Sequence, residues 1–189
     1  VFPAALNHHQ RLALAWSVTP APLPKRLLQR AADIARGIAE QIELEGVLAI
    51  ELFLTESGDL FVNELAPRPH NSFHATERAC VTSQFEQLTR AACDLPLGDT
   101  SIVRPGAIVN LFGDLWRDGQ PPNFAEALAD PLVRLHLYGK PGPRPGRKMD
   151  HPWALGASTF DAAPTARAAA ARIGADTDDV PPMVRDLGA

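Results

Sequence analysis

Two short apolar segments, Val47-Leu-Ala-Ile-Glu-Leu-Phe-Leu54 and Leu60-Phe-Val-Asn-Glu-Leu65, decide the fold of the first part of this chain. Each is short and apolar enough to form a strand, and the turn dipeptide Ser57-Gly58 lies between them. The sequence therefore predicts a β-hairpin. Its anomaly is Glu51, a carboxylate on the otherwise apolar face of the first strand.

The register of this hairpin brings a second carboxylate opposite the first. If the loop has two residues, Glu56 pairs with Asp59, and counting back pairs Glu51 with Glu64. Directly opposed carboxylates repel each other, and a buried pair needs a cation or a shared proton. Oxygen ligands of this type favour magnesium together with phosphate oxygens. The hairpin thus indicates a metal–nucleotide site, although an edge strand with Glu51 in solvent fits the same pattern. Beside Glu64, Asn63 offers an amide as a ligand or hydrogen-bond donor.

Two further segments carry polar groups that suit anionic ligands. Ala66-Pro-Arg-Pro-His-Asn-Ser72 follows the hairpin, and its prolines exclude a regular strand or helix. Arg68 can clamp an anion and His70 can transfer a proton, but a rigid surface turn explains the segment equally simply. Tyr138–Lys148 contains Lys140, Arg144, Arg147 and Lys148 with no acid, which suits a phosphate or, alternatively, a solvated linker.

The remaining pattern predicts an α+β chain with a boundary near residues 98–104. Apolar residues recur at helical spacing between Pro24 and Ile42, and a second helix is predicted over residues 75–92. The other expected elements are strands at 107–112 and 133–138, a helix at 162–173 that starts slightly after Pro164, an irregular segment at 1–22 and a tail at 176–189. We divide the chain into domains of residues 1–100 and 101–189.

The composition excludes several classes of protein. The chain has 189 residues, is 46% hydrophobic and has a formal net charge of −4, so a core is expected and bulk attraction to nucleic acid is not. No apolar run approaches the ~20 residues of a membrane span, and no signal peptide is visible. Cys80 and Cys93 are expected to be reduced thiols of a cytoplasmic protein. Because the chain begins with Val1, we expect it to be processed, cleaved or incomplete.

No Walker loop, dinucleotide fingerprint or nucleophile elbow is present. If ATP binds, this chain supplies metal ligands while the phosphate clamp lies elsewhere. Asn7-His8-His9 is the remaining polar motif, and the residues themselves give no reason to choose between the two histidines.

Several of these segments together resemble 5-(carboxyamino)imidazole ribonucleotide synthetases, which are ATP-grasp ligases of purine biosynthesis. The segments that carry the resemblance, in chain order, are Glu51-Leu-Phe, Asn63-Glu-Leu-Ala-Pro-Arg-Pro-His-Asn-Ser72, Thr82-Ser-Gln-Phe-Glu86, Arg90-Ala, Leu95-Pro-Leu-Gly98 and Arg144-Pro-Gly-Arg-Lys-Met149. The resemblance covers nearly the whole chain. It implies the second half of an ATP-grasp domain, an antiparallel sheet with helices, followed by a small β-rich carboxyl-terminal domain.

The resemblance also implies an activity. Members of that family use Mg-ATP to activate bicarbonate, through carboxyphosphate, and transfer the carboxyl group to aminoimidazole ribonucleotide. Glu51 and Glu64 match the magnesium ligands, and Asn63 and His9 match residues of the nucleotide site. Arg68, His70 and Asn71 match the bicarbonate and imidazole end, with Arg68 and His70 as catalytic residues. Lys140 and Arg147 match the pair that holds the ribonucleotide phosphate.

The resemblance has limits that generate further expectations. The amino-terminal half of the family is not represented, so this chain is expected to be inactive without that half, and a homodimer is expected by analogy. Phe73 stands where the family usually has glycine, and it would be strained if that position has a positive φ. The alternatives are another ATP-grasp ligase, such as a formate-dependent glycinamide ribonucleotide transformylase, or a catalytically dead module.

Overall fold

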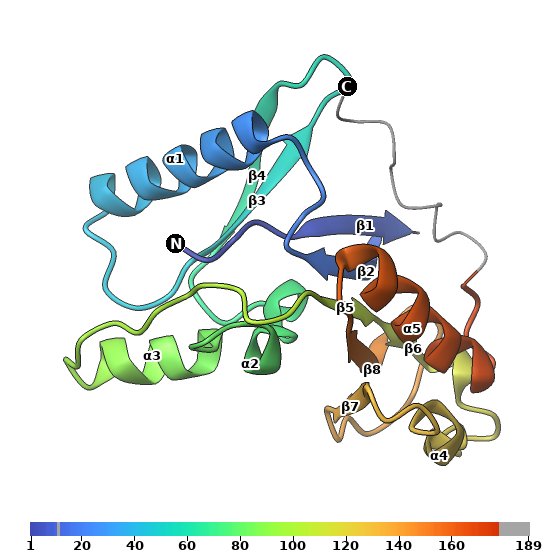
Figure 1. Ribbon diagram of the computed structural model, residues 1–189. Helices are drawn as coiled ribbons and strands as arrows, with labels where there is room; N and C mark the ends of the chain where they lie inside the picture. Colours follow the sequence, from blue (N-terminus) through green and yellow to red (C-terminus); the bar gives the residue numbers. More distant parts are fainter. Residues whose placement is uncertain (11, 178–189) are drawn as a thin grey trace.

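The computed structural model describes residues 1–10 and 12–177, so most of the predicted tail lies outside the described residues. Its largest element is a six-stranded antiparallel sheet (Figure 1), in which β1-β2-β5-β8-β6 lie in that order and β7 also pairs with β8. The strands are β1 (Leu6–Gln10), β2 (Ala13–Thr19), β5 (Gly106–Val109), β6 (Leu111–Phe112), β7 (Val133–Leu137) and β8 (Lys148–Leu155).

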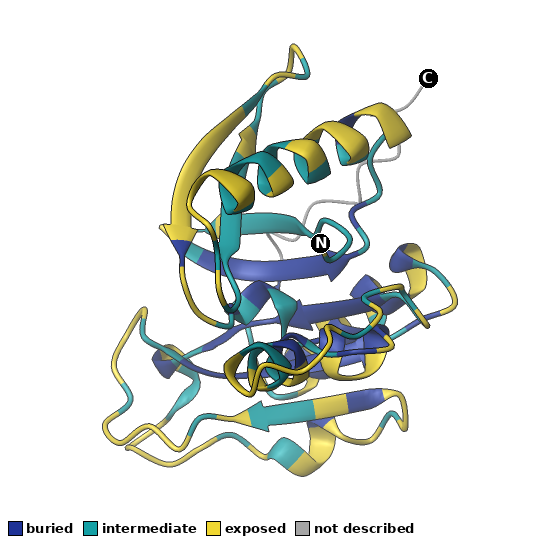
Figure 2. Ribbon diagram, turned by 90° about the vertical axis from the view of Figure 1, so that its left-hand side faces the viewer, coloured by how far each residue is buried: buried dark blue, intermediate teal, exposed yellow. Residues whose placement is uncertain are grey.

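The predicted hairpin forms a separate two-stranded sheet of β3 (Ala49–Leu54) and β4 (Leu60–Ala66). Helix α1 (Lys25–Gln41) lies alongside it (Figure 1), and Pro24 occupies the N-cap position, as its fixed φ allows. This confirms the helix predicted from apolar spacing. Figure 2 shows that β4 is exposed along most of its length, whereas β2 and β8 are largely buried.

Alternating side chains of the large sheet pack against helices on both faces. On one face, Ala107 and Val109 contact the alanine-rich helix α5 (Thr159–Arg172), whose small side chains allow a close approach to the sheet. On the other face, Ile108 and Trp153 pack around Ala75, beside the short helix α2 (Thr76–Ala79). Most of the core therefore comes from residues 101–177 and from the strands within residues 1–22, with Ala75 added on one face.

The prediction of one continuous helix over residues 75–92 is wrong. The segment is divided into α2 and α3 (Gln84–Ala92), and Cys80 between them is extended and bridges to Ile102. Ser83 starts α3 as its N-cap and accepts a hydrogen bond from the Glu86 amide, which is why the chain begins a new helix there. The other short elements are η1 (Asn71–Phe73), η2 (Gly113–Leu115) and α4 (Phe124–Ala127).

Three other local predictions need correction. Residues 1–22 are not irregular, because they contain β1 and the buried strand β2. Strand β8 is absent from the prediction because its buried Asp150 and His151 and its Pro152 do not resemble a central strand. Pro152 is tolerated where the pairing on one side of β8 passes from β5 to β6. Helix α5 begins before Pro164, at Thr159, because Ser158 and Asp161 form a capping box.

The predicted division at residue 100 stays a prediction, although the large sheet crosses it. Strand β2 pairs with β5 over Trp16–Thr19 and Gly106–Val109, so residues from both predicted domains share one sheet. Within the described residues, no helix has the length and apolar character needed to cross a membrane.

Gly113 follows β6 and packs against the loop of residues 138–148, which we call the basic loop. Its replacement gives a test of the fold. A Cβ on Gly113 would collide with the backbone of Arg144, and the Gly113 amide donates to the Arg147 carbonyl. We expect Gly113→Ala to lower the free energy of unfolding by about 1–3 kcal/mol, measured by urea denaturation. The control Gly37→Ala meets open space in α1 and should raise it by roughly 0.5–1 kcal/mol. Equal stabilities of the two variants would contradict the placement of this loop.

Candidate active site

The hairpin places Glu51 directly opposite Glu64, as predicted, but its loop and its register differ from the predicted ones. The loop spans Thr55–Asp59 and is closed by the Thr55 amide, which donates to the Asp59 carbonyl, so Glu56 does not pair with Asp59. This shifts the outer pairing to Leu54 with Leu60, and a β-bulge at Asn63 shifts it back. Bulges often redirect side chains beside functional sites. This bulge restores the register in which Glu51 and Glu64 are directly opposed.

His70 joins the two glutamates in one cluster. One ligand atom from each of Glu51, Glu64 and His70 lies within 4.8 Å of the others, and His70 Nε2 is 3.6 Å from Glu51 Oε1. The side chains of His70 and Glu51 are 10% and 13% exposed, whereas Glu64 is exposed. Burial lowers the pKa of His70, Glu51 opposes that shift, and the nearby cations Arg68 and Lys148 lower the pKa further. The ring is therefore held largely neutral at neutral pH.

A buried glutamine fixes the backbone of His70. The Gln84 side chain accepts from the His70 amide at 2.8 Å and donates to the His70 carbonyl at 2.9 Å. The hydroxyl of Ser72 lies 2.9 Å from His70 Nδ1 and sets the orientation of the ring. Gln84 belongs to the segment Thr82–Glu86, so two separate motifs of the sequence form one structural unit.

Asn71 connects this loop to the large sheet. Its Nδ2 donates to Tyr138 Oη at 2.6 Å, and its Oδ1 accepts from Asn110 Nδ2 at 2.8 Å. Burial raises the pKa of Tyr138 to about 12, so its hydroxyl stays protonated. Because Tyr138 follows β7 and Asn110 lies between β5 and β6, the sheet positions the loop that carries His70.

The basic loop ends beside the carboxylates. Burial lowers the pKa of Lys148, Glu51 opposes that shift, and the cations Lys140 and Arg68 lower the pKa further. Lys140 Nζ donates to the Lys148 carbonyl at 2.8 Å and lies 4.7 Å from the centre of the Tyr138 ring. Arg147 donates to the carbonyls of Pro141 and Gly142. Cations thus gather where the hairpin presents its two acids.

The predicted site residues fall into three groups. Glu51, Glu64 and His70 come together, and Asn63 forms the bulge next to them. Arg68, Asn71, Lys140 and Arg147 lie on the two loops that reach this cluster. His9 is exposed on β1, and in the described part of the chain no hydrogen bond or ring contact joins it to the hairpin, so its role stays a prediction.

Two residues of this site were not assigned a role from the sequence. Lys148 is only one of four cations in the basic loop, and its approach to Glu51 depends on the unpredicted strand β8. Gln84 acts through the backbone of a residue fourteen positions away, which no local pattern indicates. The condition for strain at Phe73 is not met, because Phe73 lies in η1 without a positive φ, and its ring packs near Phe2.

Comparison with known proteins assigns both parts of the chain. Residues 1–85 match the ATP-grasp domain family, and residues 106–163 match the phosphoribosylaminoimidazole carboxylase C-terminal domain family. The N5-carboxyaminoimidazole ribonucleotide synthase of Bacillus subtilis is 49% identical over 152 residues, which cover 79% of this chain and 38% of that relative.

Solved structures agree with these matches. The N5-carboxyaminoimidazole ribonucleotide synthetase of Thermus thermophilus has a TM-score of 0.77 at 37% identity and covers 90% of this chain and 44% of that one. The Aspergillus clavatus synthase, solved in complex with ADP and 5-aminoimidazole ribonucleotide, has a TM-score of 0.80 at 29% identity, covering 91% and 46%.

The fold and these matches define an ATP-grasp ligase domain joined to a carboxylase-type carboxyl-terminal domain. More specifically, the chain belongs to the N5-carboxyaminoimidazole ribonucleotide synthase family and matches the carboxyl-terminal part of its members. It spans 38% of the length of the B. subtilis relative.

The glutamine that holds His70 has a matched partner elsewhere in the same helix. Gln87 is also buried and makes the same two bonds, to the amide and carbonyl of Gly98. We expect Gln84→Ala and Gln87→Ala each to cost about 1–3 kcal/mol, because each leaves backbone groups without partners. Hydrogen exchange should rise in residues 68–74 only in Gln84→Ala and in residues 96–100 only in Gln87→Ala. Unchanged exchange at residues 68–74 in Gln84→Ala would contradict this role.

Proposed function

We propose that this chain supplies the metal-binding and substrate-binding part of an enzyme that carboxylates 5-aminoimidazole ribonucleotide with bicarbonate, using ATP and passing through carboxyphosphate. The observation that carries the proposal is the opposed pair Glu51 and Glu64, with His70 against it and the cationic side chains beside it. The identity to N5-carboxyaminoimidazole ribonucleotide synthases supports the choice of substrates.

The residues at the hairpin fit magnesium. Two carboxylates face each other across β3 and β4, and hard oxygen ligands of this kind are the ones that Mg²⁺ prefers. We assign Glu51 and Glu64 as its ligands, with Asn63 and His9 at the nucleotide. Magnesium bound there would neutralise charge on the ATP phosphates. The other functional groups that we assign to this site are protein side chains.

Arg68, His70 and Asn71 are assigned to the bicarbonate and imidazole end. Arg68 is exposed beside the cluster and can bind an anion through two parallel hydrogen bonds. His70, held neutral by burial, can exchange a proton at Nε2 while Ser72 holds Nδ1. Lys148 adds an amino group next to Glu51, and together these groups stabilise negative charge that develops during transfer.

Lys140 and Arg147 are assigned to the ribonucleotide phosphate. Both side chains now donate to carbonyls of their own loop, and a phosphate would offer them charged acceptors instead. Phosphate bound there would lie at the same end of the site as Tyr138 and Asn71. In this proposal the imidazole lies toward His70.

The rest of the ATP-grasp domain is the partner that we propose for the exposed apolar side chains of the hairpin. Large apolar side chains are exposed there, and burying such surface stabilises a domain contact. These residues are Phe53, Phe61, Val62 and Leu65, with exposed fractions of 46–60%. The homodimer and the cytoplasmic location stay predictions by analogy with the family.

A chimera tests this proposal. The matching part of the B. subtilis relative is replaced by this chain, and ADP release is followed with Mg-ATP and bicarbonate, with and without aminoimidazole ribonucleotide. We expect release to require the ribonucleotide and to fall at least about a hundredfold in Glu64→Gln. Glu56→Gln, an exposed acid of the hairpin loop, is the matched control and should retain full activity.

Other outcomes of this experiment would support one of the alternative functions. Release that depends on formate and glycinamide ribonucleotide would identify a transformylase instead. A folded chimera that does not bind Mg-ATP would identify a catalytically dead module. Activity of Glu64→Gln equal to that of the parent chimera would overturn the metal assignment.

The phosphate assignment predicts a selective defect. In the same chimera, Lys140→Met should raise KM for the ribonucleotide about tenfold or more, because a charged contact to phosphate is lost, and should leave KM for ATP unchanged. Arg144→Gln removes a neighbouring cation of the same loop as the control. Steady-state kinetics with each substrate varied separately measures both values. A rise in KM for ATP instead would place Lys140 at the nucleotide.

A further inference from the structure

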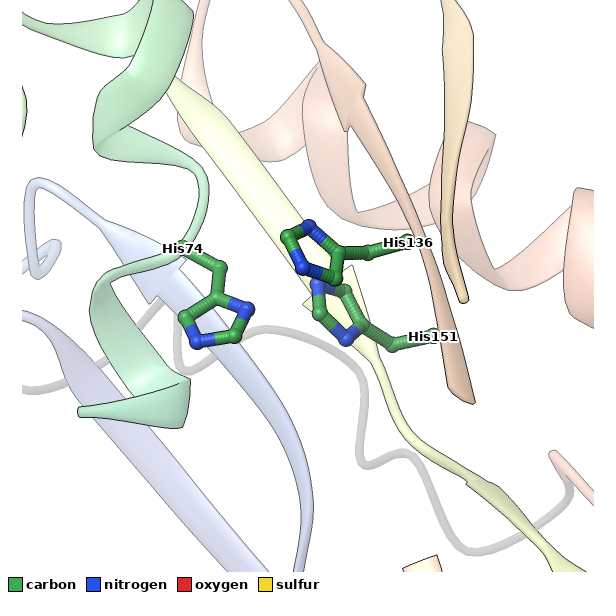
Figure 3. A group of neighbouring side chains, drawn as sticks. All are labelled: His74, His136 and His151. Carbon is green, nitrogen blue, oxygen red and sulfur yellow. The ribbon is translucent and has the colours of Figure 1, made fainter. Parts of the chain in front are cut away.

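Three histidines from separate segments form a second cluster, distinct from the carboxylate site. His74 lies between η1 and α2, His136 on β7 and His151 opposite it on β8 (Figure 3). Their ring centres are 4.7 Å apart for His74 and His136, 4.9 Å for His74 and His151, and 5.1 Å for His136 and His151. One nitrogen of each ring lies within 4.8 Å of the other two.

Two nitrogens of this cluster are buried and have no hydrogen-bond partner among the described residues. They are Nε2 of His151, whose side chain is completely buried, and Nδ1 of His74. A buried polar atom without a partner costs about 1–3 kcal/mol. Neither atom contributes to the site assigned to ATP and the ribonucleotide, so their burial has no explanation in the proposed function.

A tyrosine orients the most buried ring. Nδ1 of His151 lies 2.9 Å from Tyr138 Oη, which also accepts a hydrogen bond from Asn71. Metal binding requires the tautomer in which Nδ1–H donates to the Tyr138 oxygen, because that tautomer leaves the lone pair of Nε2 for the ion. Metal-binding histidines usually have such a second hydrogen bond, which fixes the tautomer of the ring.

The surroundings also keep two of these rings uncharged. Burial lowers the pKa of His74 to about 4 and that of His151 to about 2, and the neighbouring histidines lower both further. Neutral imidazole is the form of histidine that coordinates metals.

We propose that His74, His136 and His151 form a three-histidine site for a divalent transition-metal ion such as Zn²⁺. Imidazole nitrogens suit zinc, nickel and copper, whereas magnesium prefers oxygen, so this site is separate from the one at Glu51 and Glu64. Zn–N bonds of about 2.0–2.1 Å in tetrahedral geometry place ligand nitrogens about 3.4 Å apart. The rings of His136 and His151 are stacked with an angle of 10° between their planes, so binding requires these rings to rotate until their lone pairs meet at one ion.

The position of the site suggests what the metal does. His74 belongs to the segment that continues from the His70 loop, whereas His136 and His151 belong to the large sheet. A bound ion would therefore tie the active-site loop to β7 and β8, in addition to the Asn71–Tyr138 hydrogen bond. The expected consequence is a more stable chain with metal than without it.

Cobalt provides a direct test, because tetrahedral Co²⁺ with nitrogen ligands absorbs visible light far more strongly than Co²⁺ in octahedral oxygen sites. The whole chain, freed of metal with a chelator, is titrated with Co²⁺ and then with Zn²⁺ as competitor. The variants are His136→Gln and His74→Gln, with His9→Gln as the control for an exposed histidine and Glu51→Gln as the control for the carboxylate site. Melting temperatures are measured with and without Zn²⁺ for every protein.

We expect the parent chain to give the tetrahedral spectrum with one ion per chain, reversed by Zn²⁺, and to melt at a higher temperature with Zn²⁺. Both controls should behave like the parent, while each cluster variant should bind at least about tenfold more weakly and lose the shift in melting temperature. A parent chain without the tetrahedral spectrum would overturn the proposal whatever the variants do. Loss of the spectrum in His9→Gln or Glu51→Gln would overturn it too.

Discussion

The pairing of β2 with β5 is the constraint on which the rest of the structure depends. It joins residues 16–19 to residues 106–109. The resulting sheet contacts the loop that carries His70 and includes the strands on either side of the basic loop. Asn110, directly after β5, donates both to the Leu14 carbonyl on β2 and to Asn71 in the His70 loop. The sheet pairing and the position of the loop that carries His70 are therefore connected by one side chain. The Asn71–Tyr138 hydrogen bond adds a second link between this loop and the segment that carries the cations.

The sequence predicts elements whose pattern is local and misses those whose pattern is set by long-range packing. Helix α1 has apolar residues at helical spacing, and the hairpin has a turn dipeptide between two apolar runs. Strand β8 carries a buried acid, a buried histidine and a proline, which only the paired strands around it can accommodate. The helix predicted over residues 75–92 shows the same limit, since Cys80 leaves the helix to bridge Ile102.

The opposition of Glu51 and Glu64 was predicted correctly through two errors that cancel. The loop register differs by one residue from a two-residue turn, and the bulge at Asn63 restores the pairing. A shift of one residue would have turned Glu64 to the other face of the strand. The bulge therefore places both carboxylates on one face of the hairpin, as the proposed metal site requires. By contrast, no chemical pattern in the sequence indicates Gln84, whose role is to satisfy the backbone of His70.

Buried and exposed titratable side chains occupy different parts of the site. Glu51 and His70 are mostly buried, where each unpaired charge is costly, whereas Glu64 and Arg68 are exposed and keep their hydration. Lys148 interacts electrostatically with Glu51, so a basic side chain lies near the buried carboxylate. An arriving cation would be bound by both acids, and an arriving anion would be attracted by Arg68, Lys140 and Arg147. Opposite charges gathered on the hairpin and the basic loop suit the proposed reaction, whose substrates are a metal–phosphate complex and two further anions.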